Sequence, residues 1–425
     1  MIPDQIRFSI QGGLGFPLPK MIKVRQKFPA DEVADIAATT RDTIEALKLS
    51  NLSGKRIAIT AGSRKIANLE KILRATVCCL KEHGAVPFIV PAMGSHGQAT
   101  AEGQHRLLAD LGITEERVGA PIISSMDVVK IGELEGGYPI YCDRVAAQAD
   151  GIVVCGRIKP HTSIKGIVES GLCKMMVVGL GKHTGAACFH RQGYHRLAEI
   201  LPKSAEVFLK NTNILFGLGI VENAFDRTMR VEAIAPERLI EREAELLEEA
   251  KRNMPRFLLD EIDVLIIQRI GKDISGAGMD PNITGRTVTP LPMKAPIPIK
   301  CIVVLDIIES SHGNATGIGG ADITTKRVVE KIDFNAMYTN VMTSGALVAA
   351  RLPVILNNDE EAVRVAIKCT PRERIEDVKV VRILDTLHMT EIEVSENYLP
   401  ALCGNDSFEI LGESALRFDE RGSLI

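Results

Sequence analysis

The chain has 425 residues, of which 45% are hydrophobic and 25% are charged, and its formal net charge is −3. These values are ordinary for a globular protein and leave no basic excess that would favour nucleic acid or an anionic membrane. The absence of tryptophan and the aromatic content of 4% argue against stacking platforms for single-stranded nucleic acid.

The N-terminal sequence lacks the basic segment and apolar core of a secretory signal, and no apolar run reaches the roughly 18 residues of a membrane span. The nine cysteines form no CxxC motif, which argues against a structural zinc site and a disulfide framework. We therefore expect a cytoplasmic protein that binds neither membranes nor nucleic acid. The sequence is compatible with a homodimer but does not set the oligomeric state.

Alternation of apolar and polar residues predicts extended segments at 6–13 and 20–28. Strand and helix patterns then alternate along the chain. Apolar runs of strand length occur at 55–60, 86–92 and 149–158, and helical spacing occurs at 68–84 and 100–112. This order predicts a parallel sheet covered by helices.

A long charged helix is expected at 235–255, and a second series of elements follows it. Strands are predicted at 261–268, 301–308, 352–358 and 378–384, with a helix at 359–369. The fold class is therefore α/β, with two domains whose mostly parallel sheets are covered by helices and with the active site in the cleft between them. We expect an N-terminal cofactor-binding domain at 1–257, a C-terminal domain at 258–394, and a terminal segment, 395–425, that packs back on the first domain.

Three polar residues follow predicted strands, where open parallel sheets bind their ligands. They are Arg64, His96 and His161. The two imidazoles titrate near physiological pH, so they could exchange protons with opposite faces of one substrate, although surface-loop histidines are equally common. Arg64 is a solvated residue or a bidentate ligand for a carboxylate.

The segment at 171–190 contains Lys174 in an apolar setting and a Gly-Leu-Gly-Lys sequence. A nucleotide-hydrolysing phosphate loop is excluded because Met176 and His183 stand where glycine and serine or threonine are required. A looser phosphate-binding glycine loop remains, and it would contain Gly179, Gly181 and His183. A lysine among apolar residues is costly unless its charge is paired or its amine reacts covalently.

A second glycine-rich loop, 271–286, follows a predicted strand. Its polar residues include Asp280, Asn282 and Arg286. Such a loop either only connects two elements or forms one side of a binding site, and its charged residues favour the binding site.

In the types and spacing of these residues, the chain resembles the nickel-dependent lactate racemase family. In that family a lysine is followed five residues later by glycine and sixteen later by histidine, as are Lys174, Gly179 and His190. The family's Gly-Ser-His loop matches Gly94-Ser95-His96, and its histidine upstream of the lysine is similar to His161.

Several positions depart from the family pattern. Ala61 stands where the family has an acidic residue before Arg64, and Cys173 stands where it has arginine. Asp280-Pro281-Asn282 resembles the family's Asp-x-Asn segment, and Arg286 is the nearest substitute for a family lysine. These departures predict a divergent member that acts on another 2-hydroxy acid, such as an aldonate or a dicarboxylate.

The resemblance implies a nickel pincer nucleotide, a pyridinium-3-thioamide-5-thiocarboxylate mononucleotide that carries nickel. Lys174 would be its covalent attachment point, and His190 would be the protein's nickel ligand. The implied reaction is racemisation or epimerisation of a 2-hydroxy acid: His96 and His161 act as acid and base while the α-hydride passes reversibly to the cofactor. The residues implied to bind substrate are Arg64, Asp280, Asn282 and Arg286.

Two other functions remain open from the residues. Lys174 would also suit a lyase or dehydratase that forms a Schiff base. The chain could instead be a non-catalytic protein that binds the cofactor or a nucleotide.

Overall fold

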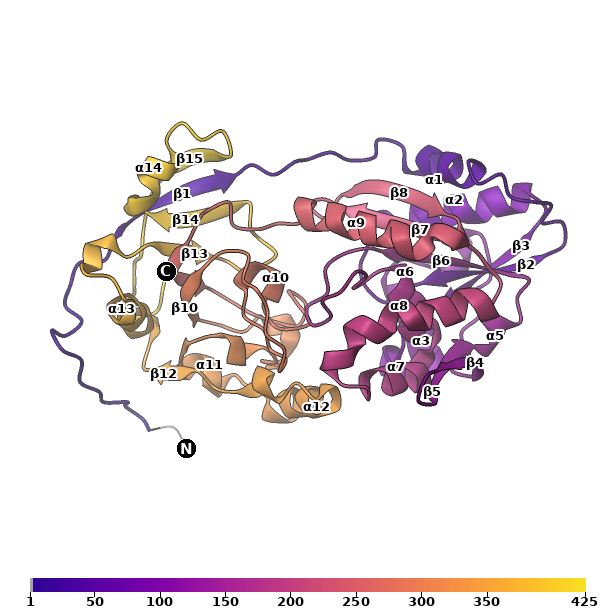
Figure 1. The fold of residues 1–425 in the computed structure, drawn as a ribbon. Coiled ribbons are helices and arrows are strands. Elements are labelled where there is room, and N and C mark those ends of the chain that lie inside the picture. Colours follow the sequence, from indigo (N-terminus) through magenta and orange to yellow (C-terminus); the bar gives the residue numbers. More distant parts are fainter. Residues whose placement is uncertain (1–2) are drawn as a thin grey trace. The chain divides into compact units, whose positions relative to one another are not determined.

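The structure, a computed structural model, describes residues 3–425 and comprises two compact units (Figure 1). One unit contains residues 29–254, and the other contains residues 3–28 together with residues 255–425. Each unit is built around its own sheet, with helices between the strands along the chain. The predicted α/β class with mostly parallel sheets is confirmed.

The 29–254 unit contains a five-stranded sheet in the order β3-β2-β6-β7-β8. The strands are β2 (Arg56–Ala61), β3 (Val86–Pro91), β6 (Gly151–Arg157), β7 (Ile214–Glu222) and β8 (Thr228–Ile234). All pairings are parallel except that between β7 and β8. Strands β2, β3 and β6 are buried over nearly their whole length, as expected for a parallel sheet covered on both faces.

Amphipathic helices cover this sheet. In α2 (Leu69–Glu82), Ile72, Leu73, Thr76 and Leu80 are buried at helical spacing, so one face of the helix contributes to the core. The other helices are α1 (Ile36–Glu45), α3 (Ala101–Asp110), α4 (Glu115–Val118), α5 (Arg144–Ala147), α8 (Tyr194–Asn211) and α9 (Leu239–Asn253). The strands β4 (Val128–Leu134) and β5 (Tyr138–Asp143) form a separate antiparallel hairpin.

Residues 172–190 are helical almost throughout. They form α6 (Leu172–Lys174), a π-helix, η2 (Met175–Leu180), and α7 (Lys182–His190). The prediction of a glycine loop here is wrong. A Cβ on Gly179 would lie 2.7 Å from the carbonyl oxygen of Ala92, so glycine is required for close helix packing rather than for a turn.

The second unit has an eight-stranded sheet in the order β12-β11-β10-β9-β13-β14-β1-β15. Its strands are β1 (Lys20–Gln26), β9 (Ile262–Ile267), β10 (Ile299–Val304), β11 (Ile323–Thr325), β12 (Val354–Leu356), β13 (Val380–Ile383), β14 (Glu391–Ser395) and β15 (Phe408–Ala415). The five strands from β12 to β13 are parallel, and β14, β1 and β15 are antiparallel to their neighbours.

The helices of this unit are α10 (Pro281–Thr284), α11 (Lys326–Glu330), α12 (Phe334–Ser344), α13 (Asp359–Cys369) and α14 (Leu399–Leu402). Asn358 caps α13 by accepting a hydrogen bond from the amide of Glu361, and three acidic residues in its first turn complement the helix dipole. The buried side chains of α13 include Ala362, Val363, Ala366 and Ile367, and they contribute to the core on one face of the sheet.

Two parts of the predicted domain organisation are wrong. Strand β1 pairs with β14 and β15, so the first 28 residues lie in the same unit as the C-terminal half. The terminal segment 395–425 also lies in that unit rather than packing on the 29–254 unit. Local periodicity identifies β1 as a strand, but it contains no information about which distant strands complete the sheet.

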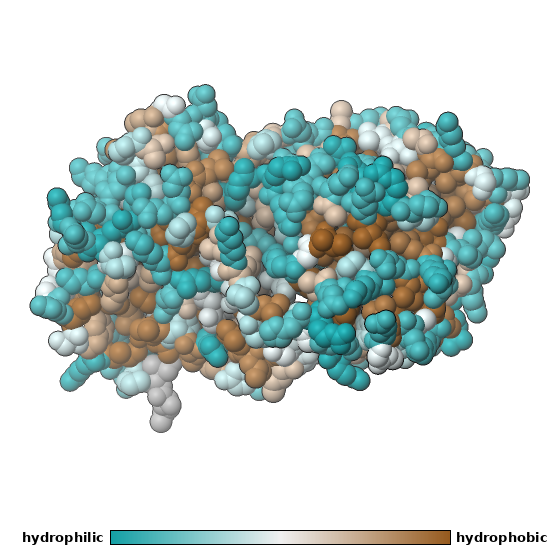
Figure 2. Space-filling model, viewed as in Figure 1, coloured by the Kyte–Doolittle hydropathy of each residue, from teal (hydrophilic) through white to brown (hydrophobic). Residues whose placement is uncertain are grey.

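On the face shown in Figure 2, hydrophilic side chains are mixed with hydrophobic patches. Among residues 3–425, no helix is both long and apolar enough to cross a membrane. None of the nine cysteines forms a disulfide in this part of the chain. Of the two predicted extended segments, 20–28 contains β1, whereas 6–13 forms no strand.

Candidate functional site

Three polar loops meet at one edge of the five-stranded sheet. Arg64 follows β2, His96 follows β3 and His161 follows β6, and β2 lies between the other two strands in parallel register. Parallel strands end at the same edge of a sheet, so the three loops are neighbours. Ser63 and His96 join two of them directly, with 2.5 Å between Oγ and Nδ1. The structure therefore places the three predicted residues on neighbouring loops, and their roles remain a prediction.

The helical segment that carries Lys174 lies against the same strand ends. A Cβ on Gly156, near the end of β6, would lie 2.8 Å from Cγ of Met175, so glycine there admits the helix. The amide of Gly94 donates to the carbonyl of Gly179 at 3.2 Å. The π-helical turn begins directly after Lys174, and such turns are rare and concentrated at functional sites.

Lys174 is partly buried, and the charged side chains that affect its pKa are positive. Burial, then the charges of Arg64 and Lys159, lower its pKa to about 8. Among residues 3–425, no carboxylate forms an ion pair with Lys174 or with the exposed Arg64. Two positive charges without an ion-pair partner, those of Lys174 and Arg64, repel each other, and an anionic ligand would relieve this repulsion.

The positive charge of Lys174 also helps to lower the pKa of three histidines. Burial and then Lys174 lower the pKa of His190, and burial followed by Arg64 and Lys174 lowers the pKa of His96 to about 4. The pKa of His161 lies well below its usual value for the same reasons, with burial as the largest cause and Lys174 next. Solvent reaches His96 and His190, so their desolvation is incomplete and their pKa values shift less than for fully enclosed rings. The site therefore favours neutral imidazoles at pH 7.

His161 is held in one orientation by the backbone of its own loop. Its Nδ1 accepts hydrogen bonds from the amides of Ser163 and Ile164 at 2.9 and 3.0 Å. A nitrogen that accepts two amide hydrogens cannot carry a proton, so neutral His161 has its proton on Nε2. In this tautomer His161 is a hydrogen-bond donor at Nε2 and not a base.

A buried carboxylate fixes the backbone of the same loop. Glu169 is 2% exposed, and its Oε2 accepts from the amide of His161 at 2.7 Å. Its two oxygens also pair with Lys165 at 3.1 Å and Lys251 at 3.2 Å. Glu169 was missed in the sequence because nothing in its local pattern marks it as buried.

Lys182 connects the helical segment to the His96 loop. It is fully buried, forms an ion pair with Asp143 Oδ2 at 3.1 Å, and donates to the carbonyl of Pro91 and to Gln104 Oε1. Gln104 in turn donates to the carbonyls of Gly94 and His96 at 2.8 and 3.3 Å. The lysine of the Gly-Leu-Gly-Lys sequence therefore supports the site from the core, whereas His183 beside it is exposed.

Replacing Lys182 with methionine should lower the free energy of unfolding by about 3–5 kcal/mol, because Asp143 would be left as an unpaired buried charge. Urea denaturation measures this loss. The double variant Lys182→Met/Asp143→Leu should recover part of it, since neither charge then remains. A loss below about 1 kcal/mol in the single variant would contradict this role for the ion pair.

Cys173 does not belong to the polar group. It is fully buried, and its amide donates to Glu243 Oε2 at 2.7 Å, which caps the start of α6 from helix α9. Burial, and then the charge of Glu243, raise the pKa of the Cys173 thiol, so it stays protonated. Cys173 therefore places a neutral thiol in the core beside the Glu243 carboxyl, and it adds no positive charge next to Lys174.

Glu243 should make stability depend on pH. Burial raises its pKa to about 7, above the ordinary 4.5, so the folded chain binds more protons than the unfolded chain between these values. The free energy of unfolding should therefore fall as the pH rises from about 4.5 to about 7. Glu243→Gln should remove this component, as denaturation at several pH values would test. An unchanged slope in the variant would show that Glu243 titrates normally.

Asp280, Asn282 and Arg286, which were predicted to bind substrate, form hydrogen bonds and an ion pair within the second unit. Asp280 caps α10 and accepts from both the amide and the side chain of Asn282 at 2.8 and 2.9 Å. Arg286 pairs with Asp322 at 2.9 Å and also donates to the carbonyls of Ile299 and Lys300. These contacts explain the three residues structurally, and their substrate role remains a prediction.

The N-terminal part of the chain is similar to a known protein family. Residues 20–196 match the family described as the lactate racemase N-terminal domain, and no curated protein matches the chain significantly. The lactate racemase apoprotein from Thermoanaerobacterium thermosaccharolyticum is 14% identical, with 86% of this chain and 94% of that chain covered at a TM-score of 0.49. A structural-genomics protein from Thermotoga maritima is 15% identical, with 76% and 83% covered at a TM-score of 0.49.

The matched segment carries every residue of the Lys174-centred group: Arg64, His96, Lys159, His161, Lys174 and His190. Residues 20–196, and with them this whole group, are therefore similar to the lactate racemase N-terminal domain family.

Proposed function

We propose that the chain interconverts stereoisomers of a 2-hydroxy acid with a nickel pincer nucleotide attached at Lys174. The observation that carries this proposal is the group of positive side chains around Lys174, which has no carboxylate partner for that lysine. The similarity of residues 20–196 to the lactate racemase N-terminal domain supports a racemase class, and the departures at Ala61 and Cys173 favour a 2-hydroxy acid other than lactate.

The residues present fit such a cofactor. Its phosphate and thiocarboxylate are anionic and would relieve the repulsion among Arg64, Lys159 and Lys174. The lowered pKa of Lys174 leaves part of its amine neutral near pH 8, as a covalent attachment requires. His190 supplies an exposed imidazole close enough to Lys174 for its pKa to respond, and the cofactor's own donors would complete a nickel site.

The bound cofactor would supply reversible removal of the substrate's α-hydrogen. The chain's residues would bind the substrate and move the hydroxyl proton. Arg64 is exposed, has no ion-pair partner among residues 3–425, and would bind the carboxylate through its planar guanidinium.

The two histidines would have different roles. His96 has its Nδ1 against the hydroxyl of Ser63, which can donate or accept, so its Nε2 is able to take the substrate's hydroxyl proton and return it. His161, with Nδ1 occupied by two amides, would instead donate from Nε2 to the developing carbonyl oxygen. This differs from the sequence-based expectation that both histidines act as acid and base.

A panel of α-deuterated 2-hydroxy acids tests the function. The protein would be produced together with the enzymes that make the cofactor, incubated with each acid in ordinary water, and the products separated by chirality. We expect one or a few acids to be inverted with the α-deuterium retained, because that hydrogen does not pass through a group that exchanges with water. Inversion with loss of the label would indicate simple deprotonation instead.

The same lysine makes a second function testable. An amine with a pKa of about 8 in a partly buried site is suited to a Schiff base, as in some lyases and dehydratases. Borohydride reduction in the presence of a 2-keto acid should then add the acid's mass irreversibly to Lys174. If no 2-keto acid is trapped, this alternative is excluded.

A further inference from the structure

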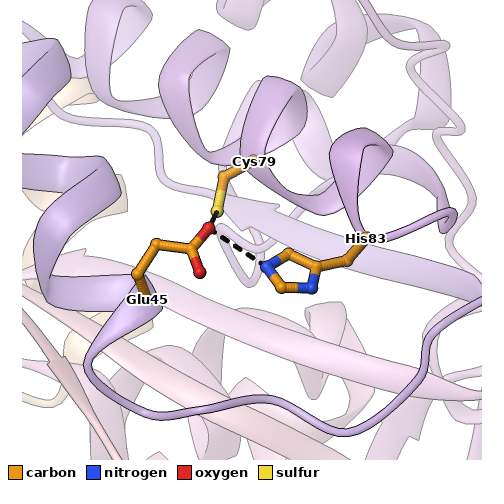
Figure 3. Close-up of side chains that lie close together, drawn as sticks. All are labelled: Glu45, Cys79 and His83. Carbon is orange, nitrogen blue, oxygen red and sulfur yellow. Dashed lines mark hydrogen bonds and ion pairs between the residues drawn. The ribbon is translucent and has the colours of Figure 1, made fainter.

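A cysteine, a histidine and a glutamate meet at the ends of two helices far from the polar loops. Glu45 is the last residue of α1, Cys79 lies in the final turns of α2, and His83 is the C-cap of α2 (Figure 3). One ligand atom from each lies within 4.8 Å of the others. After His83 the chain enters β3 at its amino end, so this trio lies at the edge of the sheet opposite His96 and Arg64.

The spacing of the three ligand atoms suits a tetrahedral metal. Zinc bonds of about 2.0 Å to oxygen or nitrogen and about 2.3 Å to thiolate place neighbouring donors about 3.3–3.5 Å apart. Here Sγ of Cys79 lies 3.4 Å from Oε1 of Glu45, and Nε2 of His83 lies 3.1 Å from the same oxygen. Small side-chain movements would therefore suffice to bring all three donors around one ion.

The backbone fixes the arrangement. Cys79 and His83 are four residues apart, and the amide of His83 donates to the carbonyl of Cys79 at 3.2 Å, so both side chains project from the same face of the helix. Glu45 approaches from α1, which packs against α2. A site of this kind has no CxxC motif, which is why sequence spacing argued against zinc.

The electrostatic surroundings favour a cation. Two helix C-termini, each with partial negative charge, converge on the trio. Arg41, whose charge lowers the pKa of both Glu45 and Cys79, is already paired with Glu82 through both carboxylate oxygens. With a thiolate and a carboxylate as ligands, a divalent ion would leave the site neutral.

We propose that Glu45, Cys79 and His83 bind one Zn²⁺ ion, with water as the fourth ligand, and that the ion links the C-terminal ends of α1 and α2. The side chains of Glu45 and His83 are 46% and 28% exposed, so solvent reaches the open position. On binding, Cys79 exchanges its thiol proton for the metal and releases that proton to water. The competing arrangement is a metal-free trio in which the Cys79 thiol and His83 donate to the Glu45 carboxylate. Burial raises the pKa of Cys79 to about 12, so the metal must overcome the cost of deprotonation.

Cobalt(II) is the probe that reports thiolate coordination directly. Untagged protein made without cofactor enzymes would be stripped with a chelator and titrated with Co²⁺. We expect one equivalent to bind with a thiolate-to-cobalt charge-transfer band and tetrahedral d–d absorption, and Zn²⁺ to displace it. Cys79→Ser should abolish the band, and Cys78→Ser, which changes the exposed neighbouring cysteine, should leave it unchanged.

Because Cys79 is buried and its replacement could disturb the fold, two variants at the more exposed ligands test the site independently. Glu45→Gln and His83→Gln should each weaken Co²⁺ binding by at least about tenfold, since changes even beyond the ligands cost that much. Added Zn²⁺ should raise the melting temperature of the wild type but not of His83→Gln. Absence of the charge-transfer band in the wild type, or its persistence in Cys79→Ser, would overturn the proposal and leave the hydrogen-bonded trio.

Discussion

Replacing Lys174 with arginine is expected to abolish nickel retention and turnover while leaving the fold intact. Arginine keeps the positive charge that helps to attract an anionic cofactor, but its guanidinium cannot form the covalent attachment. The measurement is nickel per chain after gel filtration, together with turnover of whichever 2-hydroxy acid the wild type inverts. Because Lys174 is only partly buried, the melting temperature should change little.

Two further variants identify the cause of that loss. Lys174→Ala removes both charge and amine and should behave like the arginine variant, whereas Lys210→Ala, at an exposed position on α8, should behave like wild type. If Lys174→Arg retains a full equivalent of nickel and normal turnover, the lysine serves only as a charge and no covalent attachment exists.

His96→Gln is expected to reduce kcat by about 10²–10⁴, because the variant lacks the imidazole that is assigned to take the hydroxyl proton. His161→Ala should cost about 10²–10³ through the loss of one hydrogen-bond donor. His161→Gln should recover part of that loss, since an amide N–H can still donate, whereas no amide can replace a base at position 96. The measurements are kcat and KM for the same substrate in all three variants.

The pH profile gives an independent check on these roles. His96 must be neutral to act as a base, and burial with the charges of Arg64 and Lys174 lowers its pKa, so the acid limb of kcat/KM should lie below the ordinary 6.5. Equal losses in His161→Gln, His161→Ala and His96→Gln would contradict the assignment and restore two equivalent acid–base histidines.

Much of the fold follows from short patterns in the sequence. Strands β2, β3, β6 and β9 and helices α2, α3 and α13 form where periodicity and chain order place them, to within a few residues. The long-range pairing of β1 with β14 and β15 does not follow, because any strand with a free edge could complete the sheet. For this reason residues 3–28 and 395–425 were assigned to the wrong unit, although the predicted boundary at 257 lies close to the observed boundary at 254.

Some features of the candidate site likewise follow from the sequence, and others do not. The rule that loops meet at the carboxyl ends of parallel strands correctly brings Arg64, His96 and His161 together. The helical form of residues 175–190 was missed because glycines that permit tight packing look the same in sequence as glycines that permit turns. The tautomer of His161 depends on the directions of two backbone amides, which no residue pattern specifies.

Buried polar residues account for the remaining differences. Glu169, Lys182 and Glu243 are charged residues at positions with no local sign of burial, yet each supports a part of the site from the core. Their partners lie up to 91 residues away along the chain, as for Lys182 and Pro91. Only tertiary structure reveals such support.

The mass of the Lys174 peptide shows whether the cofactor is attached covalently to this lysine. Protein produced together with the cofactor-making enzymes would be digested at acidic residues and examined by tandem mass spectrometry, with nickel measured on the same sample. We expect the added mass of the mononucleotide on Lys174 and not on the peptides that carry Lys159 and Lys182. An unmodified Lys174 peptide from protein that inverts a 2-hydroxy acid would contradict this expectation.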